Sequence, residues 1–315
     1  MPDNVSDIKV LIEDILKGDR LSLARGISII ENDGNGKEEL ISGIYSSIGK
    51  AHRIGITGPP GVGKSTLTLQ LAKYYRSKEM SIGIIAVDPT SPFTGGALLG
   101  DRIRMNELFN DPKVFIRSMA TRGSLGGLAA AATESGDLLD ASGKDMVIFE
   151  TVGTGQSEMD IAETCDSVIL VLAPETGDGI QALKAGFMEI ADLIVINKSE
   201  REGSEKTEIE MKTALSLRDH SDWEIPVIKT VALQNLGVEE LAEGISDHLD
   251  YLKDNESLEK RRQEQLIRRV KTIIRKLLRD AFWTEEKLLH LNSIKETFPN
   301  GIHSPYITAR EMVNN

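Results

Sequence analysis

One glycine-rich stretch has the residue types and spacing of a phosphate-binding loop. Its sequence, Gly58-Pro59-Pro60-Gly61-Val62-Gly63-Lys64-Ser65, satisfies the pattern G-x-x-x-x-G-K-[ST], and Thr66 follows directly. Backbone N–H groups of such a loop, and the positive end of the helix after it, point at a bound polyphosphate. Lys64 would reach the β- and γ-phosphates, and Ser65 would give its hydroxyl to Mg²⁺. A plain Gly/Pro turn is the alternative, but the match at every key position predicts a nucleotide site at Gly58 to Thr66.

Three acidic residues at the ends of apolar runs or loops could hold the metal ion. Asp88 follows an apolar run, and Asp101 follows a Gly-rich loop thirteen residues later. Each aspartate alone would more often be a helix cap, but after a phosphate loop both fit better as metal ligands on a mobile switch. Glu150 ends another apolar run, where a Walker-B-type carboxylate would stand, and Gly153 would offer a γ-phosphate-sensing amide. A simple strand-to-helix turn is the alternative for Gly153.

A second motif indicates which base the site would bind. The apolar run Leu193–Ile196 is followed by Asn197-Lys198-Ser199-Glu200. Guanine offers an N1–H and an exocyclic amine to a carboxylate, whereas adenine offers no such pair of donors. An Asn-Lys-x-acid sequence therefore predicts guanine binding. The usual acid is aspartate, and Glu200 is one methylene longer, which weakens this prediction without overturning it.

Seven apolar runs alternate with helical patterns and would position these motifs. Most are continuously apolar, as strands covered by helices on both faces are. The expected strands are Ile54–Thr57, Ile82–Val87, Val114–Arg117, Met146–Glu150, Val168–Ala173, Leu193–Ile196 and Val227–Thr230. We predict an α/β fold with a doubly wound, mainly parallel sheet, and a nucleotide site at the carboxyl ends of its strands.

Helical patterns flank the expected sheet on both sides. The first has an apolar stripe of Val10, Leu11, Ile15 and Leu16, and Asp19 is a candidate cap for the next helix. We predict a helical N-terminal extension over residues 1–50, a P-loop domain over 51–254 and a helical C-terminal region over 255–315. The stretch Leu258–Phe282 has an apolar stripe between basic residues. That stripe would either face the protein's own core or form a partner or dimer surface.

Composition argues against several other classes of protein. Lys and Arg total 37 and Asp and Glu 49, a net charge of −12, which disfavours a general nucleic-acid surface. Cys165 is the sole cysteine, so neither a disulfide framework nor a Cys-based zinc site is expected. The apolar runs are far shorter than the ~20 residues of a membrane span, and the first residues lack a targeting pattern. We expect a cytoplasmic protein that binds neither membrane nor nucleic acid.

Taken together, these blocks resemble the methylmalonyl-CoA mutase-associated GTPases of the MeaB/ArgK type over nearly the whole chain. The most family-specific are Thr121-Arg122-Gly123 and Gly155-Gln156-Ser157-Glu158. The resemblance implies a GTPase that uses GTP and Mg²⁺, is a homodimer through its C-terminal helices, and serves an adenosylcobalamin-dependent acyl-CoA mutase as a metallochaperone. Members couple GTP hydrolysis to loading of intact cofactor and removal of damaged cobalamin.

The resemblance also implies roles for particular residues. It places Asp88, Asp101 and Glu150 in the Mg²⁺ and switch network. It places Lys184 in a mobile switch that rearranges when the mutase binds. Our own hypothesis is that Lys184 supplies a catalytic charge there, and a solvated lysine on a helix face is the alternative. The Ala232 N–H would contact the guanine carbonyl.

Two other functions are alternatives. An ATP-dependent kinase or energiser associated with basic amino-acid transport would require ATP preference and membrane association. A nickel-type metallochaperone GTPase would show a Cys/His cluster. The five histidines are scattered without ligand spacing, and each is expected to be a surface or capping residue: His52, His220, His248, His290 and His303.

Overall fold

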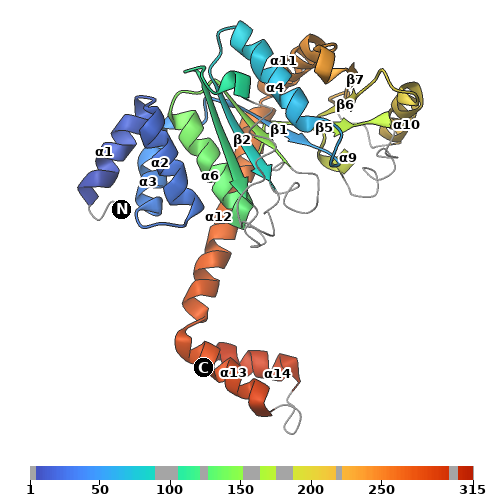
Figure 1. The fold of residues 1–315 in the computed structure, drawn as a ribbon. Coiled ribbons are helices and arrows are strands. Elements are labelled where there is room, and N and C mark those ends of the chain that lie inside the picture. The colour runs from blue at the N-terminus through green and yellow to red at the C-terminus, as the bar shows by residue number, and fades with distance from the viewer. Residues whose placement is uncertain are drawn as a thin grey trace. The chain divides into compact units, whose positions relative to one another are not determined.

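The computed structural model describes residues 5–88, 106–120, 127–151, 164–174, 187–217, 222–297 and 304–314 (Figure 1). The chain divides into two compact units, residues 1–259 and 260–315. The first unit contains the sheet and the loops that carry the motifs above. The site therefore belongs to this unit.

A seven-stranded sheet forms the centre of the first unit. Its order is β3-β2-β4-β1-β5-β6-β7, and every pairing is parallel. The strands are β1 (His52–Thr57), β2 (Ile82–Asp88), β3 (Val114–Ala120), β4 (Met146–Glu150), β5 (Ser167–Leu172), β6 (Leu193–Asn197) and β7 (Val227–Thr230). The chain begins the sheet at a central strand and builds outward on both sides of it. The predicted doubly wound α/β fold is confirmed.

Helices cover both faces of the sheet, which explains the continuous apolar strands (Figure 1). On one face, α4 (Lys64–Ser77) and α11 (Val238–Asp254) pack together in one hydrophobic cluster with side chains of the central strands. On the other, α6 (Gly127–Ala141) packs on β2, β3 and β4, while α9 (Phe187–Ile190) and α10 (Ser204–Ser216) lie by β5, β6 and β7. Every residue of β4, β5 and β6 is buried. Short 3₁₀ turns occur at Tyr45–Ser47, Asn106–Leu108 and Ala232–Gln234.

Three N-terminal helices pack on α6: α1 (Val5–Leu16), α2 (Arg20–Glu31) and α3 (Lys37–Ile44). The predicted cap is confirmed, because the Asp19 carboxylate accepts the Ser22 N–H at 2.7 Å. The expected stripe on α1 was partly wrong, since Val10 is 57% and Leu16 40% exposed. With 3.6 residues per turn, the buried face of α1 instead comprises Ile8, Leu11 and Ile15.

A buried carboxylate joins the end of this helical segment to the sheet. Asp140, near the end of α6, accepts the backbone N–H groups of residues 49–51 at 2.7, 3.1 and 3.0 Å. Arg53 on β1 pairs with Asp137 at 2.8 Å and with Asp140 at 3.2 Å. Burial alone would lower the pKa of Arg53, but these carboxylates outweigh it and raise that pKa. The entry into β1 is therefore held by charge as well as by packing.

Two histidines expected to be surface or capping residues are buried at the edge where the strands begin. His52 Nε2 lies 2.8 Å from Ser167 Oγ, which lies 2.8 Å from His248 Nδ1. His248 Nε2 lies 3.3 Å from Asp192 Oδ1. Because the carboxylate only accepts, a neutral His248 carries its hydrogen on Nε2, and Ser167 then donates to Nδ1. The expectation was wrong because partners more than eighty positions away satisfy both rings.

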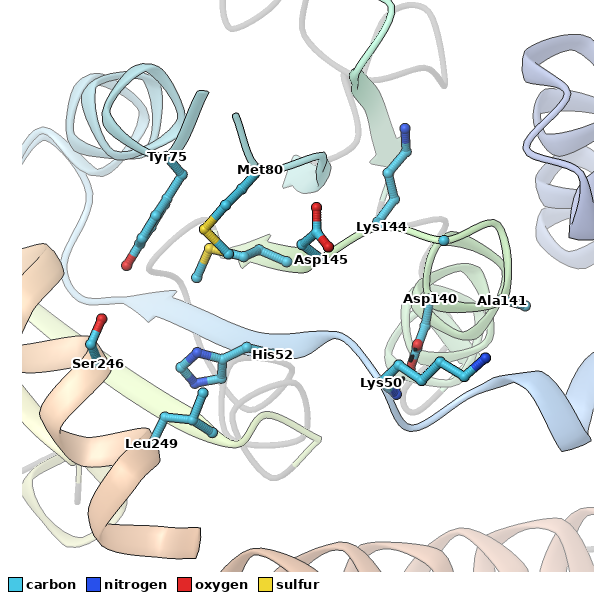
Figure 2. Close-up of a pocket in the computed structure, with 12 residues that line it drawn as sticks. Lys50, His52, Tyr75, Met80, Asp140, Ala141, Lys144, Asp145, Ser246 and Leu249 are labelled. Carbon is cyan, nitrogen blue, oxygen red and sulfur yellow. Dashed lines mark hydrogen bonds between the residues drawn. The ribbon is translucent and has the colours of Figure 1, made fainter. Parts of the chain in front are cut away.

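A cavity of about 400 Å³ lies at this same edge, lined by residues of β1, α4, α6 and α11 (Figure 2). The side chains of Lys50 and Lys144 point away from its centre (Figure 2). Asp140 and Asp145, which also line it, already accept backbone N–H groups. The six residues of β1 separate this cavity from the phosphate loop, a distance of about 20 Å.

The second unit consists of helical segments. They are most of α12 (Ser257–Phe282), with α13 (Glu285–Thr297) and α14 (Pro305–Asn314). Lys287 on α13 donates to the Met312 carbonyl of α14 at 3.1 Å and lies 4.2 Å from the centre of the Phe282 ring. The α12 stripe is exposed: Leu266 42%, Val270 45%, Ile273 44% and Leu277 55%. Among the described residues, no helix is long and apolar enough to cross a membrane.

Candidate nucleotide-binding site

The phosphate loop connects β1 to α4 at the carboxyl edge of the sheet, and α4 begins at Lys64. A side chain at Gly58, where φ is +136°, would place its Cβ 2.1 Å from the Val171 carbonyl oxygen on β5. At Gly63, where φ is +98°, a Cβ would lie 2.4 Å from Asn197 Nδ2. These two positions require glycine both for backbone conformation and for close approach to neighbouring strands. The loop is thus shaped by β5 and β6 as well as by its own sequence.

Lys64 is positioned inside the loop. Its ammonium group donates to the Gly58 carbonyl at 2.6 Å and to the Pro59 carbonyl at 2.8 Å, and the residue is 6% exposed. Pro60 and Gly61 form the exposed tip of the loop. The N-terminus of α4 and the Lys64 ammonium are thus close together, and both favour an anion.

Ser65 and Glu150 meet beside the loop. The Ser65 hydroxyl donates to Glu150 Oε1 at 2.5 Å, and both residues are buried. Glu150 ends β4, which is paired with β1, so the sheet brings together two residues that are 85 positions apart. Hydroxyl and carboxylate oxygens are ligands that Mg²⁺ prefers. The chemistry of this pair therefore fits the expected metal ion.

Asn197, the last residue of β6, is held entirely by protein groups in this structure. It is 3% exposed, and its Nδ2 donates to the Val62 carbonyl at 2.8 Å. Its Oδ1 accepts the Thr230 hydroxyl at 3.1 Å and the Ala232 N–H at 3.0 Å. Asn197 thus joins the expected base-binding loop, the phosphate loop and the end of β7. The N–H of Ala232, expected to meet a guanine carbonyl, is directed at Asn197 here.

Lys198 and Glu200 lie on the more open side of this loop. Lys198 has a φ of +57°, and its ammonium group donates to the Gly61 carbonyl at 2.7 Å. This is a second connection between the base-binding and phosphate loops. Glu200 is less restrained, with its carboxylate 4.0 Å from Arg201 Nε and its side chain 43% exposed.

Several expected site residues lie outside the described part of the chain. These are Asp101, Gly153 and Lys184, and the side chain of Asp88 at the end of β2. Of the expected metal ligands, the described side chains are Ser65 and Glu150, and they are in contact. Within the described ranges, no group of three or more His, Cys, Asp or Glu residues forms a candidate metal cluster.

Two threonines that the motifs did not single out lie at this edge. Thr57 precedes the phosphate loop and Thr151 follows Glu150. Their hydroxyl oxygens are 3.2 Å apart, and the residues are 1% and 3% exposed. Thr57 ends β1 and Thr151 directly follows β4, and it is the strand order that brings the two together.

Comparisons with known proteins agree on one family. A family model described as Methylmalonyl Co-A mutase-associated GTPase MeaB matches residues 23–287. A Pyrococcus abyssi protein named as a GTPase is 50% identical over 85% of this chain and 84% of its own length. The Caenorhabditis elegans protein named Methylmalonic aciduria type A homolog, mitochondrial, is 31% identical over 98% of this chain and 82% of its own. A crystal structure described as LAO/AO transport system kinase has a TM-score of 0.75 and 27% identity, covering 100% of this chain and 99% of its own. The chain therefore belongs to the family of methylmalonyl Co-A mutase-associated GTPases of the MeaB type, and it is a GTPase.

Proposed function

We propose that this GTPase is a chaperone of an adenosylcobalamin-dependent acyl-CoA mutase of the methylmalonyl-CoA mutase type. GTP hydrolysis would gate cofactor loading and protect or reactivate the mutase. The family description names association with that mutase, and one relative is named for methylmalonic aciduria. The observation that carries the proposal is a phosphate loop that holds the Lys64 ammonium and, beside it, the contact of Ser65 with Glu150, in a chain that matches this family over most of its length.

In this proposal the site residues divide into three groups. Lys64 and the N–H groups from Gly58 to Thr66 bind the phosphates. Ser65, Asp88, Asp101 and Glu150 hold Mg²⁺, which when bound neutralises charge that develops on the transferred phosphoryl group. Gly153 contacts the γ-phosphate.

Guanine would be read by the loop after β6. Glu200 accepts the paired donors of guanine, and the Lys198 stem covers one face of the base. The contacts of Asn197 with Val62 and Thr230 support this assignment, because they fix the loop that carries both residues. Titration calorimetry is expected to show tighter binding of GDP than of ADP, and tighter ADP binding would contradict the assignment.

We further propose that the protein is a cytoplasmic homodimer that forms through residues 255–315. Residues 1–50 would be a helical extension, and residues 51–254 would be the GTPase domain. The exposed apolar stripe on α12 supports a second copy as its partner, because it has the spacing of a helix seam. Sedimentation should give a dimer for the parent protein and a monomer for Ile273→Asp. Ile209→Asp, at a 65% exposed position on α10 and outside the proposed interface, is the matched control and should remain dimeric.

Association with the mutase is testable directly. Purified mutase from the same organism should form a complex with this protein and raise its GTP turnover. Lys64→Ala should lose nucleotide binding and therefore turnover, because the Lys64 ammonium, held at the Gly58 and Pro59 carbonyls, would neutralise phosphate charge. A protein that hydrolyses GTP but neither binds the mutase nor responds to it would contradict the chaperone proposal while leaving the GTPase assignment intact.

Lys184 would act when the mutase binds. A positive charge delivered late to the transferred phosphoryl group can contribute about 10³–10⁵ in rate. Lys184→Ala is therefore expected to lose stimulation by the mutase, with unchanged GDP affinity as the control for folding. Full stimulation of this variant in a confirmed complex would mean that Lys184 is a surface residue.

One alternative function has a specific observation in its favour. The crystal structure described as LAO/AO transport system kinase aligns with the whole chain. A transport energiser should prefer ATP and associate with membranes. Tighter binding of ATP than GTP, together with recovery in the membrane fraction, would favour it over the mutase chaperone.

A further inference from the structure

The phosphate loop and the strand that carries Glu150 leave the sheet side by side. In the β1–β4 ladder, Ile56 is opposite Glu150, and the Thr151 N–H donates to the Ile56 carbonyl at 3.0 Å. Thr57, the last residue of β1, and Thr151, directly after β4, are the next two residues along these segments. One residue further on, β1 becomes the phosphate loop at Gly58. The relative position of these strand ends therefore sets where Glu150 stands with respect to the loop.

The side chains of Glu150 and Thr151 point to opposite faces of the sheet, because successive side chains alternate between the faces along an extended chain. Ile148 shares a hydrophobic cluster with residues of α4, and Glu150, two residues on, reaches Ser65 on α4. Phe149 belongs to the cluster on the opposite face, so Thr151 points to that face as well. The contact between Ser65 and Glu150 thus lies on one face, and the contact between Thr57 and Thr151 on the other.

The two hydroxyl groups fasten the strand ends where the main-chain ladder stops. Thr151 Oγ1 lies 3.2 Å from Thr57 Oγ1 and 3.4 Å from the Ile56 carbonyl oxygen. Both residues are almost completely buried, so water does not readily replace either partner. Without the contact between the two hydroxyls, Thr151 would keep only its N–H bond and its longer hydroxyl contact, both to the Ile56 carbonyl.

We propose that Thr57 and Thr151 are positioning residues for the metal site. Their contact on the far face holds β4 against β1, and so keeps the Glu150 carboxylate beside Ser65, where the two would hold Mg²⁺. Neither threonine touches the nucleotide or the ion in this proposal. The inference rests on the proposed Mg²⁺ role of Ser65 and Glu150.

The test compares the Mg²⁺ requirement of matched variants of the full-length protein. The Mg²⁺ concentration that gives half-maximal tightening of GTP binding is measured with a fluorescent GTP analogue. Thr57→Val keeps the side-chain shape and removes the hydroxyl, and we expect it to raise this concentration about fivefold, as the loss of one hydrogen bond would. Thr57→Ser keeps the hydroxyl and should restore the parent value, as should Thr151→Ser relative to Thr151→Val.

A remote threonine separates positioning from general destabilisation. Thr207 on α10 is also buried, and its hydroxyl donates to the Gly203 carbonyl at 3.1 Å. Thr207→Val should lower the unfolding midpoint by an amount similar to Thr57→Val, yet leave the Mg²⁺ requirement unchanged. GDP affinity measured in EDTA should be equal in all of these variants.

The outcomes distinguish this inference from the proposal on which it depends. If the parent protein tightens on GTP with Mg²⁺ and Thr57→Val has the same Mg²⁺ requirement, the positioning role is refuted. It is also refuted if Thr207→Val shifts that requirement equally. If the parent itself shows no Mg²⁺ dependence, the assignment of Ser65 and Glu150 to the metal fails, and the inference fails with it.

Discussion

Alanine at Gly58 would place a methyl group against the backbone of a buried strand. The added Cβ would lie 2.1 Å from the Val171 carbonyl oxygen, and β5 is paired on both sides and buried throughout. Gly61, three residues on in the same loop, also has a positive φ of +82°, yet nothing lies within 4 Å of its Cβ position. The two glycines therefore separate conformational strain from steric overlap.

The expected losses of stability differ accordingly. An L-residue at positive φ costs about 1–2 kcal/mol, and both variants should lose at least that. Overpacking against a fixed backbone adds about 1–3 kcal/mol, which applies to Gly58→Ala. We thus expect losses of about 1–2 kcal/mol for Gly61→Ala and about 2–5 kcal/mol for Gly58→Ala.

Urea unfolding without nucleotide or Mg²⁺ measures both values free of ligand effects. The slope of the unfolding free energy against urea should be unchanged in both variants. Equal losses for the two glycines would refute the reasoning, because they would mean that β5 moves aside at no cost. A larger loss for Gly61→Ala would contradict it further.

Three more substitutions test contacts that hold the first unit together. Asn197→Ala removes three hydrogen bonds and should lower the unfolding free energy by about 3 kcal/mol, measured by urea unfolding. Asp140→Ala leaves Arg53 paired with Asp137 but leaves three backbone N–H groups without their acceptor. The same assay should show an unfolding free energy lower by about 3–5 kcal/mol, and a loss below about 1 kcal/mol would contradict the role given to this carboxylate. Burial would raise the pKa of Asp145, but bonds from the Ser81 N–H and hydroxyl lower it below 3.8. A carboxyl whose pKa is lower in the folded state than in the unfolded state stabilises the fold above its unfolded-state pKa, and this stabilisation is lost as pH falls through the folded-state pKa. Asp145→Asn should therefore be less stable than the parent at pH 7, and the difference in stability should shrink below pH 3.8.

The sheet could be predicted from sequence because its strands are continuous apolar runs. Two strands, Met146–Glu150 and Val227–Thr230, have the predicted bounds. The others differ by one to three residues at an end, in several cases because a polar residue with a distant partner is part of the strand. β3 continues beyond Arg117 to Ala120 along its pairing with β2, and Arg117 itself donates from Nε to Glu31 on α2 at 3.1 Å. β1 begins at His52, which contacts Ser167. Local patterns carry no information about partners 86 or 115 positions away.

The site shows the same limit. The phosphate loop, Glu150 and Asn197 were recognisable because fixed spacing and strand ends define them. The hydrogen bonds of Asn197 with Val62 and Thr230, and the contact of Thr57 with Thr151, depend on how β1, β4, β6 and β7 come together. Such contacts become visible when the strand order is known.

The bond between Asn197 and Val62 spans 135 positions, and this span has a consequence for biogenesis. During synthesis the phosphate loop emerges from the ribosome long before β6 and β7 do. Contacts so distant in sequence form late in folding, after the cost of closing the intervening chain has been met. A nascent chain that ends before residue 197 therefore lacks the hydrogen bond from Asn197 to Val62 of its phosphate loop. The phosphate loop would thus gain its complete set of Asn197 contacts only once translation has passed Ala232, and a nascent chain that stops earlier should bind nucleotide less tightly.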